Sequence, residues 1–293
     1  MDVLALAMGM TFAFIWSSAF SSSRIVVLEA PPLTALAVRF AISGTIGVAI
    51  ALLLGGSLKL TRGQWRATIL FGICQNVIYL GFNFVAMQWI EASLAAIIAS
   101  SLPLIVAFLN RFLVNERLGM LGSLGLIAGF LGVALVMGGR LTGGSDSLGV
   151  ALCVVAAVAL AVATLTIRNA FTQGNVLMVV GLQMLVGCVI LAVPATILET
   201  PSVNWSWQFG AAFAYTTVFP GLVATWLWFT LVNRTGPTRA SSFHFLNPFF
   251  GVAVAGLLLG EQFTIFDMVG VVIITAGILA VQLAREHPRN SSA

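Results

Sequence analysis

The sequence predicts an all-α integral membrane protein with ten transmembrane helices, arranged as two inverted five-helix repeats. Three observations support this fold class. The 293-residue chain is 60% hydrophobic and only 8% charged, with a mean hydropathy of +1.08. It contains ten apolar stretches long enough to cross a bilayer. A proline followed 13 positions later by a glutamate occurs twice, in LPLIVAFLNRFLVNE at 102–116 and in NPFFGVAVAGLLLGE at 247–261.

The composition indicates that the folded chain lies in a lipid bilayer. A globular domain carries roughly 25% charged residues, so this chain has too few charges to cover itself in water and must be dissolved in lipid. The three cysteines, Cys74, Cys153 and Cys188, all fall in apolar stretches without CxxC spacing. We therefore expect them to pack as small apolar side chains, with no disulfide and no metal.

Stretches of about 20 apolar residues are typical of membrane-spanning helices. We expect spans at 3–23, 32–54, 67–88, 93–113, 118–138, 148–168, 176–198, 207–231, 238–259 and 265–284. The gaps between them are short and carry turn residues such as Pro31 and Pro237, so no soluble domain is expected. No basic region precedes the first span, which argues against a cleaved signal peptide.

The basic residues predict the orientation. If the ten spans are right, the N-terminus, the tail and the loops that follow even-numbered spans lie on one side of the membrane, and the remaining loops lie on the other. The first side holds ten of the 13 basic residues: Lys59, Arg62, Arg66, Arg111, Arg117, Arg168, Arg234, Arg239, Arg285 and Arg289. The second side holds two, Arg24 and Arg140. This bias places both termini in the cytoplasm. The net charge of +4 is thereby explained without a nucleic-acid partner.

The duplicated proline and glutamate belong to an internal repeat. A shift of 145 residues aligns Pro103 with Pro248, Leu113 with Leu258, Glu116 with Glu261, Gly125 with Gly270 and Gly132 with Gly277. A shift of 144 aligns Leu33 with Leu177 and Arg39 with Gln183. Each half, 1–143 and 144–293, contains five spans. Because five is odd, the second half must enter the membrane upside down, an architecture of secondary transporters.

These features resemble the drug/metabolite transporter superfamily and, within it, the EamA-type exporters, in which both halves match one repeat unit. The similarity covers residues 3–284 and includes FIWSSAF at 14–20 and the Arg39-Phe40 pair. Among the branches, the bacterial aromatic amino acid exporters are most similar. The resemblance implies a multi-pass protein of the bacterial inner membrane.

The first two spans carry Trp16 and Arg39. Trp16 precedes Ser17, Ser18 and Ser21, so a small polar face lies beside a large flat ring, and we predict that Trp16 contacts a substrate cavity. Arg39 either reaches the outer interface by snorkelling or pairs with an acid such as Glu91. We interpret it as a structural or gating residue.

The third span carries the densest set of polar residues. Gln75, Tyr79 and Asn83 are spaced by four and share one helix face with Asn76. Such a face either hydrogen-bonds neighbouring helices or lines a hydrated path. We predict the path, with Gln75, Tyr79 and Asn83 binding both ends of a zwitterion.

The fourth and ninth spans contain Pro103 and Pro248. A proline inside a helix frees the carbonyl four residues earlier, here Ala99 and His244. The alternatives are a kink that merely fits the bundle and a hinge or cavity wall; recurrence in both halves favours the second. Nearby Ser100, His244 and Asn247 complete the predicted substrate-binding set. His244, the only histidine in a span, is either a neutral imidazole bonded to neighbours or functional.

Glu116 and Glu261 are expected at helix ends on opposite membrane faces. They either cap the next helix from its N-terminal side or latch a gate. In the fifth span, glycines recur every three or four residues, at Gly119, Gly122, Gly125, Gly129 and Gly132. This small face permits close helix contact, as scaffold or as a dimer face.

No acid lies near the middle of any span, and proton-driven carriers usually need a buried carboxylate or histidine relay. We therefore predict weak or absent proton coupling, and neither a cofactor nor catalysis, because His244 has no acid within ten residues. The expected function is export of small neutral or zwitterionic metabolites, best matched by aromatic and other hydrophobic amino acids. Alternatives are other amino acids, purines or drugs, or a non-transporting membrane scaffold. A sugar-phosphate carrier would need cavity cations, and only Arg39 is a candidate. The partners are a small-molecule substrate and the bilayer, and the chain is a monomer or a homodimer.

Overall fold

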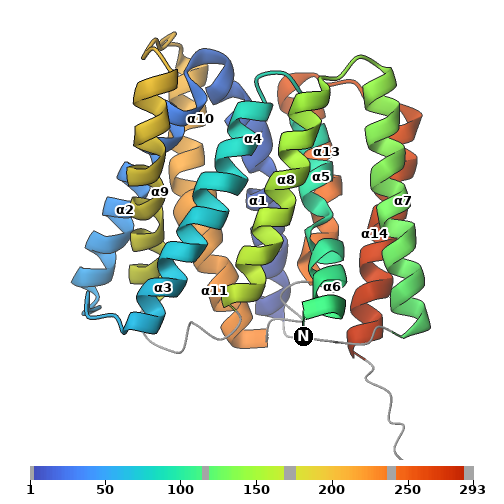
Figure 1. The fold of residues 1–293 in the computed structure, drawn as a ribbon, viewed down its shortest axis with the longest axis horizontal. Helices are drawn as coiled ribbons and strands as arrows, with labels where there is room; N and C mark the ends of the chain where they lie inside the picture. The colour runs from blue at the N-terminus through green and yellow to red at the C-terminus, as the bar shows by residue number, and fades with distance from the viewer. Residues whose placement is uncertain (1–2, 114–118, 168–175, 236–241, 287–293) are drawn as a thin grey trace, which may run out of the picture.

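The computed structural model describes residues 3–113, 119–167, 176–235 and 242–286, and all the regular structure in these ranges is helical. The helices stand side by side, and α1 begins at the same end of the bundle where α14 finishes, the lower end in Figure 1. We call this end the terminal end and the opposite end the distal end. The predicted all-helical membrane fold is confirmed.

Ten spans follow one another in the predicted order. The first half contains α1 (Val3–Glu29), α2 (Pro32–Leu53), α3 (Arg62–Phe71) continued by the π-helical η1 (Gly72–Leu80) and α4 (Gly81–Ala86), α5 (Ala92–Ser100) with α6 (Leu102–Leu113), and α7 (Met120–Thr142). The second half contains α8 (Ser147–Ile167), α9 (Val176–Leu198), α10 (Trp207–Val218) continued by the π-helical η2 (Phe219–Val223) and α11 (Ala224–Thr235), the 3₁₀ turn η3 (Ser242–Leu246) with α13 (Asn247–Leu259), and α14 (Ile265–Glu286). Within the described ranges, nine helical spans are long and apolar enough to cross a membrane, and Phe243–Leu259 is a shorter apolar helix.

The third span begins earlier than expected, at Arg62 in place of residue 67. A capping box explains the extension: Thr61 Oγ1 accepts the Gln64 N–H at 3.2 Å, and Gln64 Oε1 accepts the Thr61 N–H at 2.9 Å. Reciprocal bonds of this kind satisfy amides at a helix start that would otherwise lack partners. The helix therefore starts in the polar segment before the apolar stretch.

The inverted repeat is visible where α7 packs along α14. A methyl group added to Gly277 would lie 2.6 Å from the Gly125 carbonyl oxygen, and one added to Gly132 would lie 3.1 Å from the Gly270 oxygen. The repeat makes Gly125 equivalent to Gly270, and Gly132 equivalent to Gly277. Gly125 therefore lies against the repeat partner of Gly132, and Gly132 lies against the repeat partner of Gly125. That reciprocal pattern is the signature of a two-fold relation between the halves.

The glycine face of α7 is therefore occupied inside the chain. Gly122, Gly125, Gly129 and Gly132 are buried, and α14 covers this helix. The dimer-face interpretation of these glycines is wrong, because the surface that would pair two copies already joins the two halves. The small residues serve as scaffold, allowing the two backbones to approach each other without side chains between them.

The second span of each half packs in the same way. α2 and α9 make another extensive contact, in which a methyl group at Gly44 would lie 3.0 Å from the Gly181 carbonyl oxygen, and one at Gly181 2.9 Å from the Gly44 oxygen. Two pairs of helices thus join the halves on opposite sides of the bundle, α2 with α9 and α7 with α14 (Figure 1). In each pair the two helices occupy the same place in their repeats. The helices between them enclose the core.

The outer surface of the bundle suits a bilayer. Large apolar side chains such as Ile127, Leu131, Val193 and Val272 are more than half exposed, which would be unfavourable in water but is expected against lipid tails. Trp205 and Trp207 are exposed at the distal end, and Trp65 at the terminal end. These positions match the interfacial tryptophans of membrane proteins.

Candidate functional site: a cavity between the two halves

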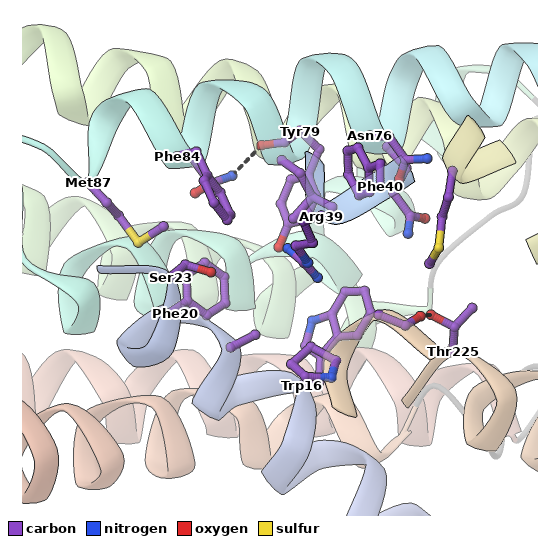
Figure 2. A pocket seen from close by; sticks show the side chains of 17 residues that line it. Trp16, Phe20, Ser23, Arg39, Phe40, Asn76, Tyr79, Phe84, Met87 and Thr225 are labelled. Atoms are coloured by element: carbon purple, nitrogen blue, oxygen red, sulfur yellow. Dashed lines mark hydrogen bonds between the residues drawn. The ribbon is translucent and has the colours of Figure 1, made fainter. Parts of the chain in front are cut away.

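A small cavity lies inside the bundle and is lined by both halves of the chain. Its walls come from α1, α2, the third span with η1 and α4, and, from the second half, α9, η2 and α11. The cavity measures about 40 Å³, room for only a few water molecules. The lining residues are Trp16, Ala19, Phe20, Ser23, Arg39, Phe40, Gln75, Asn76, Tyr79, Leu80, Asn83, Phe84, Met87, Met184, Pro220, Gly221 and Thr225 (Figure 2).

The second-half lining follows the repeat. Under the 145 shift, Pro220, Gly221 and Thr225 are equivalent to Gln75, Asn76 and Leu80, which line the cavity from the first half. The 144 shift relates Met184 in the same way to Phe40. Sequence reasoning missed these residues because it did not apply the repeat to the second and third spans. Doing so relates Met184 to Phe40 of the second span and the other three residues to positions of the third.

A π-helical segment carries these positions in each half. In η1 the Gly81 N–H bonds to the Asn76 carbonyl, five residues earlier, and in η2 the Ala224 N–H bonds to the Phe219 carbonyl in the same pattern. Pro220 lacks an N–H and so cannot continue a regular α-helical ladder there. Wider turns of this kind are common at functional sites. The sequence pattern had predicted a regular α-helix in both places.

The predicted polar face does point inward. Gln75, Asn76, Tyr79 and Asn83 are all buried and all line the cavity. Asn83 is partly committed to structure, because its Nδ2 donates to the Tyr79 carbonyl at 2.7 Å and its Oδ1 lies 3.3 Å from the Cys153 sulfur. Gln75 makes no side-chain hydrogen bond with the described residues, so its amide is available to a solute.

Asn76 joins the two halves. Its Nδ2 donates to Gln183 twice, to the main-chain oxygen at 2.7 Å and to Oε1 at 2.9 Å. The Asn76 Oδ1 has no partner within the described ranges. Part of this helix face thus hydrogen-bonds a neighbouring helix and part borders the cavity. That the face lines a hydrated path stays a prediction.

Trp16 lines the cavity as predicted from its position, although its role in binding stays a prediction. His244 lies behind it: the His244 ring packs against Trp16 at 6.5 Å between centroids, Trp228 at 5.0 Å and Phe12 at 5.4 Å. Asn247 Nδ2 lies 2.8 Å from His244 Nδ1. Neither His244 nor Asn247 is among the cavity-lining residues.

Ser100 also lies away from the cavity. Its hydroxyl donates to the Ala96 carbonyl at 2.6 Å, and the side chain is buried. Bonds from serine to the carbonyl four residues back are common in helices and consume the only donor of the side chain. The structure therefore brings Trp16, Gln75, Tyr79 and Asn83 together and leaves Ser100, His244 and Asn247 outside the cavity wall.

Pro103 and Pro248 both sit in the first turn of a new helix. The fourth span is broken between α5 and α6, and the ninth between η3 and α13. α6 begins at Leu102 and α13 at Asn247, positions related by the 145 shift. The sequence had placed the prolines inside continuous helices; they instead start a second segment, where the missing N–H costs little. Both spans are therefore discontinuous at equivalent positions of the two halves.

Arg39 corrects a prediction. It is only 4% exposed and lines the cavity, so it does not snorkel to the interface. It has no ion pair with Glu91, because that carboxylate pairs with Arg140. The guanidinium instead lies over the rings of Phe40 and Phe84, with the Cζ atom 5.7 and 5.8 Å from their centroids.

The acids and the two distal arginines form a network at the distal end. Arg140 Nε donates to Asp267 Oδ1 at 2.9 Å, its Nη2 lies 2.8 Å from Oδ2, and its Nη1 pairs with Glu91. Arg24 donates to the Met87 carbonyl nearby. Burial raises the pKa of Glu91 above its ordinary value; Arg140 opposes the shift, and the carboxylates of Glu261 and Asp267 add to it.

Glu261 caps a helix, but a different one from that predicted. Its carboxylate accepts the N–H groups of Ala92 at 2.8 Å and Ser93 at 3.0 Å, at the start of α5 in the other half. The next helix, α14, begins at Ile265 and is capped instead by Asp267, whose Oδ2 accepts the Thr264 N–H at 2.8 Å. Glu116, its repeat partner, lies outside the described residues.

Across the described ranges, no group of three or more His, Cys, Asp or Glu side chains is arranged to hold a metal ion. The site is instead a mostly apolar cavity, whose described lining residues include amide and phenol groups, one arginine and no acid. A many-helix membrane bundle with a cavity at the junction of two inverted halves is an arrangement found in membrane transporters.

Known proteins support this class. The family model for the EamA-like transporter family matches residues 3–138 and 147–283, and the chain belongs to that family. The transporter YvbV of Bacillus subtilis is 24% identical over 91% of this chain and 87% of its own. The inner membrane transporter YedA of Escherichia coli K12 is 25% identical over 92% of this chain and 88% of its own.

Similar proteins also include a plant protein and a solved structure. A chloroplastic WAT1-related protein of Arabidopsis thaliana is 28% identical over 92% of this chain and 67% of its own. A crystal structure matches with a TM-score of 0.71 and 23% identity, covering 99% of this chain and all of its own, which supports the fold. The chain is therefore a multi-pass membrane transporter.

Proposed function

We propose that this transporter exports small neutral or zwitterionic metabolites, with aromatic and other hydrophobic amino acids as its best-matched substrates. Both termini lie in the cytoplasm, and substrate leaves through the distal end. The observation that carries the proposal is the cavity wall, which combines aromatic rings with uncharged amide and phenol groups. Such a surface suits an apolar or aromatic body with a few hydrogen-bonding groups.

Alternating access between the halves explains how a solute would pass. Ligand pockets for drug-sized molecules occupy about 300–1,000 Å³, far more than the 40 Å³ cavity. The substrate therefore enters in a conformation in which the cavity is larger and open to one side. The breaks before Pro103 and Pro248 lie at equivalent places in both halves and offer matched hinges. The distal ion pairs hold one end closed.

Transport proceeds without proton coupling in this proposal. The described acidic side chains lie at helix ends, and none of them lines the cavity. His244 sits behind Trp16 among aromatic rings, away from the solute path. With no titratable carboxylate facing the substrate, the driving force is the gradient of the substrate itself.

Counterflow in proteoliposomes tests the proposal. Purified protein is reconstituted, loaded with unlabelled phenylalanine, and exposed to labelled phenylalanine, leucine or a purine base. We expect accumulation of labelled phenylalanine, a smaller signal for leucine, and no stimulation by an imposed pH gradient. Trp16→Ala and Tyr79→Ala should each lower the initial rate, because both residues line the cavity.

The control variant is Trp207→Ala, which removes an exposed aromatic side chain far from the cavity and should leave the rate unchanged. Counterflow of purines alone would favour the alternative of another metabolite class. A requirement for a pH gradient would refute uncoupled transport. Membership of a transporter family already favours transport over the scaffold alternative.

A further inference from the structure

Arg39 is a buried charge without a counterion among the described residues. Its side chain lines the cavity at 4% exposure, and its Nε has no hydrogen-bond partner within the described part of the chain. Its guanidinium lies over the rings of Phe40 and Phe84. Figure 2 shows its guanidinium in the middle of the cavity, between the helices that carry Tyr79 and Trp16.

Arg140 provides the comparison within the same molecule. It is also buried, but it forms a bidentate pair with Asp267 and a second pair with Glu91. A guanidinium stays protonated in proteins, and burying a charge without a partner is costly. The cavity therefore holds a positive charge that the described side chains leave uncompensated.

The repeat argues that this charge is not needed for packing. Gln183 occupies the position equivalent to Arg39 in the second half, and it is also buried. It is neutral, and its Oε1 accepts a hydrogen bond from Asn76 at 2.9 Å. Its Nε2 has no hydrogen-bond partner within the described residues. The equivalent position thus holds a neutral side chain that bonds a neighbouring helix, so packing at this depth does not require the charge of Arg39.

We propose that Arg39 binds the carboxylate of the substrate, and that the substrate class is the monocarboxylates with an apolar or aromatic body. This inference rests on the transport function proposed above. A guanidinium matches a carboxylate with two parallel hydrogen bonds. The rings of Trp16, Phe20 and Phe84 border the same space and suit the apolar body. A single cation balances one negative charge, which disfavours phosphate dianions.

The proposal assigns different roles in binding to the carboxylate and the ammonium group of an amino acid. The cavity wall contains no acidic residue that could pair with an ammonium group. Recognition therefore depends on the carboxylate, and the ammonium is dispensable. An aromatic acid that lacks the amino group should bind at least as well as the matching amino acid, whereas the amine that lacks the carboxylate should not.

The experiment compares three ligands of one shape: phenylalanine, 3-phenylpropionate and phenethylamine. Ligand-induced thermal stabilisation of the purified protein measures binding, and inhibition of labelled phenylalanine counterflow measures competition. We expect 3-phenylpropionate to bind within about threefold of phenylalanine or more tightly. Phenethylamine should bind about ten- to a hundredfold more weakly, the range that a charge-assisted hydrogen bond corresponds to.

Three variants locate the effect. Arg39→Gln, which copies the second half, should weaken the carboxylate ligands about tenfold or more. It should not weaken phenethylamine, because the variant lacks the positive charge that repels the ammonium group. Arg39→Lys should retain part of the carboxylate preference. Arg66→Gln makes the same substitution at an exposed arginine and should behave like the wild type. The empty Arg39→Gln protein should melt no lower than the wild type, because the substitution removes an uncompensated charge.

The outcomes separate this inference from the transport function. If phenylalanine counterflow is robust but phenethylamine competes as well as 3-phenylpropionate, the carboxylate proposal is overturned and transport stands. The same holds if Arg39→Gln binds carboxylates like the wild type. If counterflow is absent while carboxylates still stabilise the protein through Arg39, the site stands and the transport proposal fails. If no carboxylate stabilises the protein, the inference is wrong.

Discussion

Two buried arginines of this transporter have opposite electrostatic surroundings. Arg140 lies against Asp267 and Glu91 at the distal end, whereas Arg39 faces the cavity without an acid. A buried ion pair lowers the cost of desolvation because each charge serves as partner for the other. A lone charge in a cavity keeps that cost until a ligand arrives. The first arrangement suits a structural contact and the second a binding site.

The distal network gives a prediction about pH. Its charged groups are Arg140, Arg24, Glu91, Glu261 and Asp267. Burial raises the pKa of Glu91 above its ordinary value of 4.5, so the folded protein holds this proton more tightly than the unfolded chain. The resulting stabilisation is complete below pH 4.5 and is lost as the pH rises through the folded-state pKa. Glu91→Gln removes this titration.

The measurement is the melting temperature in detergent at pH values from 4 to 7, for the wild type and for Glu91→Gln. The wild type should lose stability relative to the variant as the pH rises through this range. Using the difference between the two proteins cancels the titration of the other acids to first order. A difference that stays flat, or that grows in favour of the wild type, would contradict the raised pKa.

At the level of helices, glycine contacts determine how the halves meet. A methyl group at Gly277 would lie 2.6 Å from the Gly125 carbonyl oxygen and 2.7 Å from the Gly129 nitrogen. Both atoms belong to the main chain, so neither can move aside as a side chain would. Gly277→Ala should therefore push α7 and α14 apart and destabilise the protein by about 1–3 kcal/mol, the range seen for overpacked cores.

Gly138→Ala is the matched control on α7. A methyl group there would meet no atom within 4 Å, and alanine favours a helix over glycine by about 1 kcal/mol. Chemical or thermal unfolding in detergent should show Gly277→Ala less stable than the wild type and Gly138→Ala equal or more stable. Equal behaviour of the two variants would mean that the helices are not in close contact.

The sequence predicted most of the helices but not their local irregularities. Apolar length and the 145 shift predicted the ten spans, because bilayer thickness and repeat equivalence are encoded along the chain. The polar face of the third span predicted Gln75, Asn76, Tyr79 and Asn83 at the cavity, because polar side chains avoid lipid. Neither rule could predict the π-helical turns of η1 and η2, since a local change of hydrogen bonding leaves the composition almost unchanged.

The missed contacts are long-range ones. Glu261 caps α5, and Arg140 pairs with Asp267 and Glu91, across separations of more than 40 residues. The sequence suggested other partners: the next helix for Glu261 and Arg39 for Glu91. The partners follow from how the two halves dock, which depends on packing and has no one-dimensional signal beyond the repeat.

For the whole molecule, the odd number of spans in each half determines which loops share a compartment. Ser57 lies in the exposed segment after the second span, at the terminal end, and Ser202 in the exposed segment after the seventh, at the distal end. Charge follows the same division. Lys59, Arg62 and Arg66 are exposed at the terminal end, whereas the distal arginines are engaged in internal contacts.

Cysteine labelling tests this arrangement. Ser202→Cys should react with a membrane-impermeant maleimide in intact cells, and Ser57→Cys only after permeabilisation, because the positive-inside rule places the terminal end in the cytoplasm. The wild type is the control, since Cys74, Cys153 and Cys188 lie within spans and should stay unlabelled. Labelling with the two sides exchanged would reverse the orientation but keep the inverted halves. Five spans separate Ser57 from Ser202, so the two positions must lie on opposite sides of the membrane. If both cysteines were labelled from one side, the halves would not be inverted, and alternating access between inverted halves would lose its basis.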